Sequence, residues 1–287
     1  MPKRILIQLD SDPQPSSFDS VVAIDAGVDD LLRYGSVQVT GVVPLVHGAM
    51  FTRGGDDLRH TAIFIGGSDV EVAEQLLSVC RDSFFGPVRV SLMLDANGCN
   101  TTASAAVVAA GRHVAIQGAR AVVLGGTGPV GRRVSQLLAT DGADVTLTSR
   151  SLERATLTCQ EIMEKSGQAS IKPFAIDGDH RLGKILAEAE IVVGCGAAGA
   201  ELVDKTTVQS MTDLKVAIDL NAVPPAGIGG IEVTDKAKPL GNGVAYGAVG
   251  VGGLKMKTHR AAIQSLFESN DRVLDAAEIY AIAKAIG

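Results

Sequence analysis

The stretch from residue 121 to residue 131, AVVLGGTGPVG, decides the fold. Ala121 to Leu124 form an apolar run that predicts a buried strand, and the residues from Val130 to Leu138 place apolar side chains on one helical face. Between these segments lies a G-x-G-x-x-G pattern, Gly126-Thr127-Gly128-Pro129-Val130-Gly131. A glycine-rich turn that joins an apolar strand to an amphipathic helix is typical of a dinucleotide-binding site.

Each glycine of this pattern has a predicted role. Gly126 is expected to make the tight turn, Gly128 to let backbone N–H groups approach a pyrophosphate, and Gly131 to let helix and strand pack closely. Pro129 fits the first turn of the helix, where its missing N–H costs nothing. The phosphates would lie at the helix N-terminus, where free amides and the helix dipole favour anions. The alternative is a glycine-rich turn without a ligand.

The end of the next predicted strand indicates which dinucleotide is preferred. A site for NAD usually places Asp or Glu about 20 residues after the glycine pattern, against the ribose 2′-hydroxyl. This chain instead has Ser149 and Arg150 there, with Arg154 one turn further. Hydroxyl and guanidinium groups favour a 2′-phosphate, which a carboxylate would repel. The sequence therefore predicts NADP, with NAD as a weaker alternative, unless both arginines are only solvated residues at a helix start.

The rest of the chain predicts an α/β protein of two domains. Apolar runs at 144–148, 191–193 and 216–220 alternate with helical patterns, which favours a Rossmann-type, doubly wound parallel sheet. Two of these strands end in small or polar residues expected to line the cofactor: Cys195, Gly196, Ala197 and Asn221.

A smaller α/β domain is expected before this sheet. Strands are predicted at 4–9, 61–65 and 88–94, and a helix at 70–79. A helix of small residues at 104–111 could run from one domain to the other. A capping-box pattern at 275–278 starts a C-terminal helix that we expect to pack on the first domain.

Composition excludes several classes of function. The net charge is −6 with no long basic run, which argues against nucleic-acid binding. The four cysteines form no C-x-x-C pair, so we expect no zinc or other metal site, no disulfide framework and a reduced, cytoplasmic setting. No apolar stretch is long enough for a signal peptide or a membrane span.

Two segments could present a substrate carbon to a nicotinamide. The first is 95–102, where an apolar strand ends and the small-residue helix begins, although Asn-Gly is also an ordinary turn signal. The second is 252–260, after a strand predicted at 244–249. If this segment starts a helix, Lys255 and His259 share a face. The alternative is two solvated lysines and a surface histidine.

These segments resemble the bacterial NAD(P)-dependent methylene-tetrahydromethanopterin dehydrogenases of one-carbon (formaldehyde) oxidation. The resemblance covers nearly the whole chain. It is carried by 17–19, 52–55, 84–87, 94–95, 97–98, 100–103, 126–131, 221–222, 224–225, 227–231, 252–255, Lys257, His259 and Arg260. The segments 221–231 and 252–260 are not general Rossmann features. One departure is Cys99, where Ser is expected.

The resemblance implies a pterin (substrate) domain of 1–105 plus 260–287, an NADP-binding Rossmann domain of 106–259, and an active site in the cleft between them. Lys255 falls where the family has its active-site lysine. Oxidising the methylene bridge releases a hydride without removing a proton, so catalysis rests on positioning. Asp19 and Asp95 could offset the cationic product. The other residues expected at the pterin are Phe18, Asn97, Thr102 and His259.

Several alternatives remain at this point. A related oxidoreductase acting on methylene-tetrahydrofolate, or on a polyol acid of the shikimate type, would have a similar sequence. A non-catalytic NADP-binding module belongs to a different class, and the second α/β domain argues against it. We expect a homo-oligomer, in which the apolar stretch 39–46 could form an interface.

Overall fold

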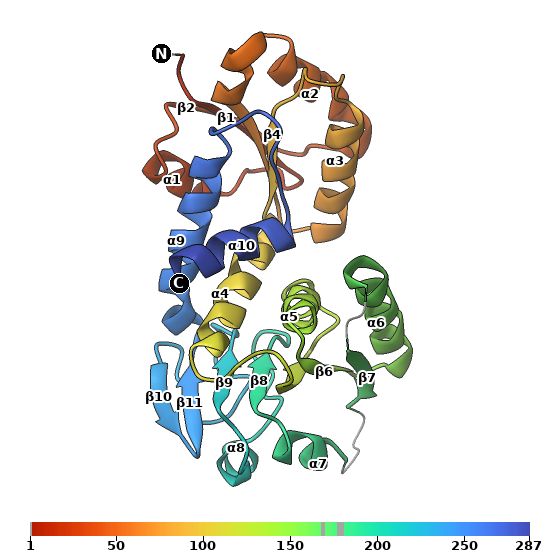
Figure 1. The fold of residues 1–287 in the computed structure, drawn as a ribbon, viewed down its shortest axis with the longest axis vertical. Helices are drawn as coiled ribbons and strands as arrows, with labels where there is room; N and C mark the ends of the chain where they lie inside the picture. The colour runs from red at the N-terminus through yellow and green to blue at the C-terminus, as the bar shows by residue number, and fades with distance from the viewer. Residues whose placement is uncertain (1, 168–169, 177–180) are drawn as a thin grey trace. The chain divides into compact units, whose positions relative to one another are not determined.

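The computed structural model describes residues 2–167, 170–176 and 181–287, and its chain divides into two compact units (Figure 1). The first unit comprises Met1–Thr101 and Met256–Ile286, and the second comprises Thr102–Lys255 with Gly287. We expected the boundaries a few residues later, at 105/106 and 259/260. Both lie inside continuous helices, α4 (Cys99–Gly111) and α9 (Ala248–Ser265), so no loop or change of composition marks them in the sequence.

The first unit is built on a parallel sheet in the order β12-β4-β3-β1-β2. Its strands are β1 (Ile5–Asp10), β2 (Asp30–Tyr34), β3 (Thr61–Gly66), β4 (Ser91–Leu94) and β12 (Val273–Leu274). Its helices are α1 (Ser17–Asp25), α2 (Val43–Met50), α3 (Val70–Asp82) and α10 (Ala276–Ile286), with short 3-10 turns η1 (Val39–Gly41), η2 (Gly55–His60) and η3 (Ala96–Gly98).

The C-terminal segment completes the core of this unit. Phe64 of β3 and Met93 of β4 share an apolar cluster with Ile263 of α9 and Ile279 of α10. One of the two hydrogen bonds of the predicted capping box is present, because the Asp275 N–H donates to the Glu278 carboxylate at 3.1 Å. The prediction that the C-terminal helix packs on the first domain is therefore confirmed.

The second unit holds a sheet in the order β10-β11-β9-β8-β5-β6-β7, parallel except for the β10–β11 pair. Its strands are β5 (Arg120–Leu124), β6 (Asp144–Ser149), β7 (Ile171–Ala175), β8 (Ile191–Gly194), β9 (Val216–Asp219), β10 (Lys236–Leu240) and β11 (Gly243–Tyr246). Its helices include α5 (Pro129–Thr140), α6 (Leu152–Ser166), α7 (Arg181–Ala187) and α8 (Lys205–Ser210).

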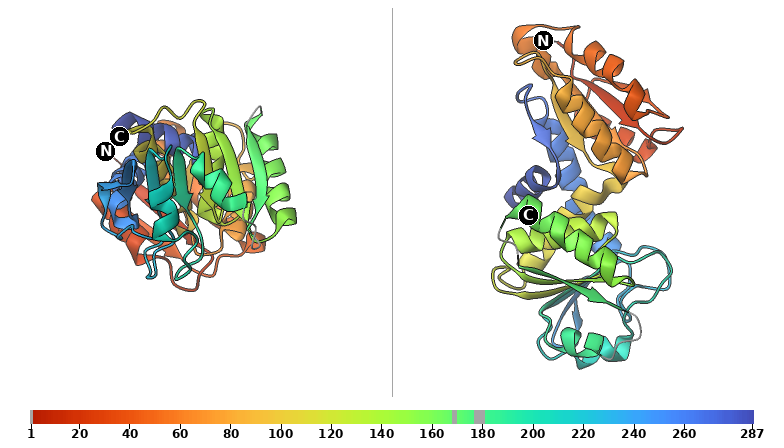
Figure 2. Two further views of the ribbon diagram at one scale, coloured as in Figure 1. Left: turned by 90° about the horizontal axis from the view of Figure 1, so that it is seen from below. Right: turned by 90° about the vertical axis from the view of Figure 1, so that its right-hand side faces the viewer.

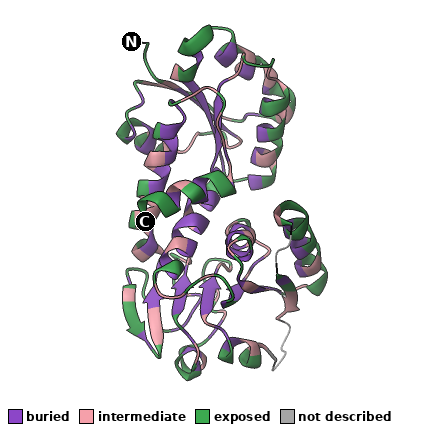
Figure 3. Cartoon of the chain, in the orientation of Figure 1, coloured by how far each residue is buried: buried purple, intermediate pink, exposed green. Residues whose placement is uncertain are grey.

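This arrangement confirms the Rossmann-type α/β prediction. Figure 2 shows α5 and α6 on one face of the sheet and α7 and α8 on the other. The strands β5, β8 and β9 are buried almost throughout, as their continuous apolar sequences predicted (Figure 3). The order of strands reverses between β5 and β8, and open α/β sheets bind ligands at the carboxyl ends of the strands beside such a switch point.

Two local predictions were wrong. The strand expected at 244–249 ends at Tyr246, and α9 already begins at Ala248, so Gly252 and Gly253 lie inside the helix. The cause is Gly247, where a Cβ would lie 2.1 Å from the Glu232 carbonyl oxygen, so the chain can turn there only with glycine. The strand expected at 88–94 forms only from Ser91.

The apolar stretch 39–46 is buried only in part, because Thr40, Gly41 and Pro44 are exposed. Val42 and Val46 are fully buried, so only the remaining residues of the stretch are available to the interface suggested by the sequence, which stays a prediction. Within the described residues, no helix combines the length and the apolar character required to cross a membrane.

Candidate functional site

The glycine-rich turn of the second unit leads into the N-terminus of α5, which is suited to bind an anion. Gly128 is the N-cap of α5, with φ −75° and ψ 166°, and as a glycine it has no side chain to accept a hydrogen bond from the first amides of the helix. Pro129 is the first helical residue, as predicted from its missing N–H. Unsatisfied amides and the dipole at this helix terminus are suited to a phosphate.

The turn is shaped by close backbone packing. A Cβ on Gly131 would lie 2.6 Å from the Gly125 carbonyl oxygen and 2.7 Å from the Gly126 Cα, so α5 approaches the turn too closely for any other residue. The left-handed residue is Gly125, with φ +69°, rather than Gly126, where we expected the tight turn. Position 126 favours glycine for another reason: a Cβ on Gly126 would lie 2.5 Å from the Cγ of Leu147 in β6.

The end of β6 presents hydroxyl and guanidinium groups. Ser149 is buried, and its hydroxyl lies 3.4 Å from the Thr127 hydroxyl and accepts the Ser151 N–H at 3.3 Å. Ser151 in turn caps α6 by accepting the Arg154 N–H. Arg150 and Arg154 are exposed, and neither forms an ion pair with any residue that the structure describes. Their guanidinium groups are therefore available to a phosphate.

The turn after β8 packs against this glycine turn. A Cβ on Gly125 would lie 2.8 Å from the Gly196 Cα, which brings 195–197 beside the helix terminus that we expect to hold the pyrophosphate. Burial raises the pKa of the neighbouring Cys195 thiol, and the nearby charge of Asp219 raises it further. Cys195 is therefore a neutral thiol at the carboxyl edge of the sheet.

Asp219, the last residue of β9, fixes the backbone that follows this strand. It is 2% exposed, and its carboxylate accepts N–H groups from Asn221 at 3.1 Å, Gly227 at 2.7 Å and Ile228 at 3.2 Å. Burial raises the pKa of this carboxyl, while the three backbone N–H groups oppose the shift. Asp219 thereby fixes the loop that follows β9.

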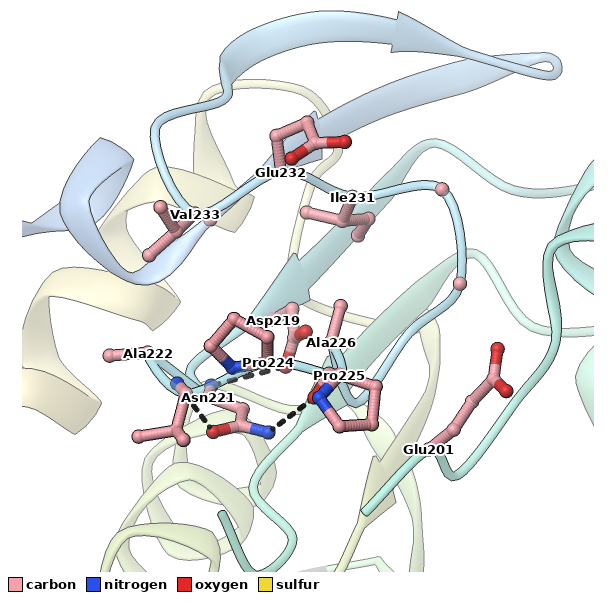
Figure 4. A pocket seen from close by; sticks show the side chains of 14 residues that line it. Glu201, Asp219, Asn221, Ala222, Pro224, Pro225, Ala226, Ile231, Glu232 and Val233 are labelled. Carbon is pink, nitrogen blue, oxygen red and sulfur yellow. Dashed lines mark hydrogen bonds between the residues drawn. The ribbon is translucent and has the colours of Figure 1, made fainter. Parts of the chain in front are cut away.

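This loop forms one wall of a cavity of about 340 Å³ (Figure 4). The Asn221 side chain, which we expected at the cofactor, is engaged by the loop itself: its Nδ2 donates to the Pro225 carbonyl at 3.1 Å and its Oδ1 accepts the Val223 N–H at 3.0 Å. The cavity is lined further by Glu201, Glu232 and Val233. Asn221 thus shapes the loop at the carboxyl edge of the sheet through hydrogen bonds from its side chain to the loop backbone.

In the first unit, Asp95 is the buried centre of the candidate substrate site. Its carboxylate accepts the Asn100 and Thr101 N–H groups, at 2.9 and 3.0 Å, and the Thr101 hydroxyl at 2.6 Å, so it caps α4. His259 is also fully buried and stacks on Phe64 with ring centroids 5.6 Å apart. His259 Nδ1 lies 4.0 Å from Asp95 Oδ2.

Phe18 and Asp19 join this cluster from the start of α1. Phe18 is 50% exposed, and its ring centroid lies 6.5 Å from that of His259. A Cβ on Gly66, at the end of β3, would lie 3.6 Å from Asp19 Oδ2 and 3.4 Å from Asp10 Oδ2. The two carboxylates therefore flank the switch point between β1 and β3, where ligands of open sheets bind.

Sequence reasoning missed Asp10. Its place at the end of an apolar strand was visible in the sequence, but only the strand order shows that it lies beside Asp19. Asp10 also accepts the N–H groups of Asp12 and Ser16, at 2.9 and 3.1 Å, which fixes the β1–α1 loop.

The other predicted substrate residues are placed differently. Asn97 is exposed with φ 52°, a left-handed turn position, and Thr102 is half-buried inside α4 as the first residue of the second unit. Lys255 is half-buried and is the last residue of the second unit, one helical turn before His259 in α9, whereas Lys257 is exposed. No group of three or more His, Cys, Asp or Glu residues in the described ranges is arranged to hold a metal ion.

Known proteins are similar to this chain over its full length. A family model described as "Methylene-tetrahydromethanopterin dehydrogenase, N-terminal" matches residues 17–97. The "Bifunctional protein MdtA" of Methylorubrum extorquens is 43% identical over 286 residues, covering 99% of each chain. The "NAD(P)-dependent methylenetetrahydromethanopterin dehydrogenase" of the same organism is 31% identical, covering 100% of this chain and 99% of the relative.

A solved structure, the ligand-free 5-ketofructose reductase of Gluconobacter sp. strain CHM43, shares the fold. It has a TM-score of 0.58 at 16% identity and covers 100% of this chain and 99% of its own. The sequence matches extend over both units and over the segments that carry Asp95, the glycine turn and Lys255. The chain therefore belongs to the methylene-tetrahydromethanopterin dehydrogenase family.

Proposed function

We propose that this protein oxidises 5,10-methylene-tetrahydromethanopterin by transferring a hydride to NADP, which gives 5,10-methenyl-tetrahydromethanopterin in one-carbon oxidation. The observation that carries this proposal is the full-length match, at 31% identity, to a relative named for that dehydrogenase. The N-terminus of α5 is suited to bind a phosphate, and Gly131 lets this helix pack closely against the glycine-rich turn. Both features support a dinucleotide as the hydride acceptor.

The preference for NADP over NAD is supported by the end of β6. Ser149 and the exposed Arg150 and Arg154 provide hydroxyl and cationic groups where NAD sites usually carry a carboxylate. A guanidinium pairs with a phosphate through charge-assisted hydrogen bonds. NAD, which lacks this phosphate, would bind more weakly.

The chemistry requires positioning rather than a general base. Loss of the hydride leaves a positive charge shared by the two nitrogens of the bridge, and no proton moves. Asp19 and Asp10, beside Gly66, place negative charge at one sheet edge, where it would stabilise such a cation. Phe18 offers an exposed ring on which a pterin can stack. Lys255, one turn before His259, is the group that we assign to orient the pterin.

A spectrophotometric assay of NADPH formation tests the proposal with two pterin carriers, tetrahydromethanopterin and tetrahydrofolate, and two cofactors. We expect turnover with methylene-tetrahydromethanopterin and NADP. Folded protein that binds NADP but turns over neither carrier would instead be a cofactor-binding module, and the proposed oxidoreductase function would be abandoned.

Methylene-tetrahydrofolate is the second candidate substrate. The two carriers share the reacting bridge, so the ratio of their kcat/KM values in the same assay decides between them.

We also propose that the protein forms a homo-oligomer in the cytoplasm. All four cysteines are unbridged, which supports a reducing compartment. Exposed apolar side chains outside the site, such as Phe51 and Phe85, support contacts between copies of the chain.

A further inference from the structure

Besides the cavity of the second unit, a hollow lies beside Phe18 in the first unit. It measures about 670 Å³ and is lined by Pro13, Gln14, Pro15, Ser16, Ser17, Phe18 and Arg33. The first six residues form the β1–α1 loop and the start of α1, while Arg33 is near the carboxyl end of β2. The hollow therefore opens at the same sheet edge as Asp10 and Asp19.

The walls of this hollow are fixed to each other by backbone contacts. The Ser36 N–H donates to the Asp12 carbonyl at 2.7 Å, and the Val37 N–H donates to the Asp10 carbonyl at 2.9 Å. A Cβ on Gly35 would lie 2.3 Å from the Pro13 carbonyl oxygen, so only glycine permits this approach. The segment after β2 and the β1–α1 loop thus form one preorganised surface.

Arg33 supplies the charge of this surface. Among its lining residues it is the one ionisable side chain, it is exposed, and it forms no ion pair with a residue in the described ranges. Two carboxylates near the loop are engaged: Asp10 accepts backbone N–H groups, and Asp12 accepts the Ser68 N–H and hydroxyl at 3.0 and 2.7 Å. A third, Asp19, lies beside Gly66 at the end of β3, with Oδ2 3.6 Å from a Cβ built there. An exposed guanidinium beside two prolines and an aromatic ring suits an anionic group on a partly apolar chain.

We propose that this hollow binds the acidic tail of the pterin substrate, with Arg33 pairing with a tail carboxylate or phosphate. The inference rests on the proposed function. Both pterin carriers bear negative groups at the end of the side chain that is remote from the reacting bridge. Phe18 borders both the hollow and His259, so a pterin stacked on Phe18 has its tail within reach of the hollow. The volume is within the range of about 300 to 1,000 Å³ typical of ligand sites.

A tail contact of this kind binds the ground state and the transition state equally. Its loss therefore raises KM for the pterin and leaves kcat unchanged. Because the contact is between charges at an exposed site, added salt should weaken it.

The experiment compares Arg33→Gln, Arg33→Glu and Arg33→Lys with the unaltered protein, using full-length methylene-pterin and a methylene-tetrahydropterin that lacks the tail. We expect Arg33→Gln to raise KM for the full-length substrate roughly tenfold, Arg33→Glu to raise it further, and Arg33→Lys to raise it least. The KM for the tail-less substrate, the KM for NADP, kcat and the melting temperature should be unchanged. Arg81→Gln, at an exposed arginine of α3 outside the hollow, is the matched control.

Three outcomes would overturn the inference. An unchanged KM for the full-length substrate in an active Arg33→Glu variant would show that Arg33 does not contact the tail. An equal rise with the tail-less substrate would assign Arg33 to the ring or to the fold. An unaltered protein that is inactive with every pterin would remove the proposed function and this subsite with it.

Discussion

The Asp95 carboxylate and the His259 imidazole meet at the carboxyl edge of the first unit's sheet, with Oδ2 and Nδ1 4.0 Å apart and both side chains fully buried. Asp95 follows β4 in the first half of the chain, whereas His259 comes from α9 near its end. This pair joins the start of α4 to α9, the two helices that continue from the first unit into the second. The carboxylate that caps α4 therefore also faces the helix that carries Lys255.

Removing the Asp95 carboxylate should destabilise the first unit. Asp95→Ala removes the acceptor of the Asn100 and Thr101 N–H groups and leaves the Thr101 hydroxyl only the longer bond to the Gly98 carbonyl, at 3.3 Å. One orphaned buried donor costs about 1 to 3 kcal/mol, so we expect a loss of at least about 2 kcal/mol in the free energy of unfolding, measured by urea titration. Asp95→Asn retains one acceptor oxygen and should lose less. An Asp95→Ala loss no larger than that of Asp12→Ala, whose bonds are exposed, would contradict this role.

Substitutions at two glycines of the turn 126–131 should affect stability and cofactor binding separately. Gly131→Ala places a Cβ 2.6 Å from the Gly125 carbonyl oxygen, and we expect it to lower the melting temperature, because overpacking costs about 1 to 3 kcal/mol. In Gly128→Ala, the nearest atom to the new Cβ is 3.6 Å away, so the fold should be retained while the pyrophosphate approach is blocked. Calorimetry and NADP titration measure both effects. Unchanged NADP affinity in Gly128→Ala would place the phosphates elsewhere.

The preference for NADP should depend on Arg150. Arg150→Ala removes an exposed guanidinium from the end of β6, and a charge-assisted contact contributes about 1.5 to 3 kcal/mol, or roughly ten- to a hundredfold in affinity. The KM for NADP should rise by this factor, and the KM for NAD should hardly change. Arg154→Ala should act in the same direction. An equal rise for both cofactors would make Arg150 a structural residue.

Lys255 should affect turnover rather than stability. Lys255→Ala and Lys255→Gln are expected to lower kcat more than about tenfold, a barrier increase above roughly 1.4 kcal/mol, with little change in NADP affinity or melting temperature. Lys257→Ala is the control, because Lys257 is exposed on the same helix while Lys255 is half-buried. If Lys257→Ala is as damaging, or Lys255→Ala has no effect, other groups must hold the pterin.

Cys195 should report cofactor binding by its reactivity. Burial raises the pKa of Cys80 to about 12 and that of Cys159 to about 11, so these thiols stay protonated at pH 8 and should alkylate very slowly. The pKa of Cys195 is raised as well, so it too should react slowly, but it is partly exposed whereas Cys80, Cys99 and Cys159 are buried, and we therefore expect it to react first with N-ethylmaleimide. Peptide mass spectrometry should show that NADP slows its modification. Unchanged labelling at saturating NADP would exclude 195–197 from the cofactor path.

The Rossmann unit was predictable from the sequence because its signals are local. The strand β5, the glycine turn and α5 are consecutive, and the Ser149 to Arg154 segment directly follows the next strand of the sheet. The small residues needed for close packing, such as Gly131, appear in the sequence as a fixed spacing. Contacts between neighbouring segments thus leave a pattern that can be read without the fold.

The family resemblance named Asp95 and His259, but only the tertiary structure shows how the first unit's site is assembled and that Asp10 and Gly66 belong to it. Asp10 and Gly66 end β1 and β3, Asp95 directly follows β4, and His259 lies in α9; the strand order β4-β3-β1 brings the first three together. The physical reason is that parallel strands require long crossover connections, so residues adjacent at a sheet edge are distant in the chain. The start of α9 also depends on a contact between segments distant in the chain. Its sequence, rich in Gly and Val, suits a strand. Because Gly247 packs against the Glu232 carbonyl oxygen, the chain instead turns there and enters the helix.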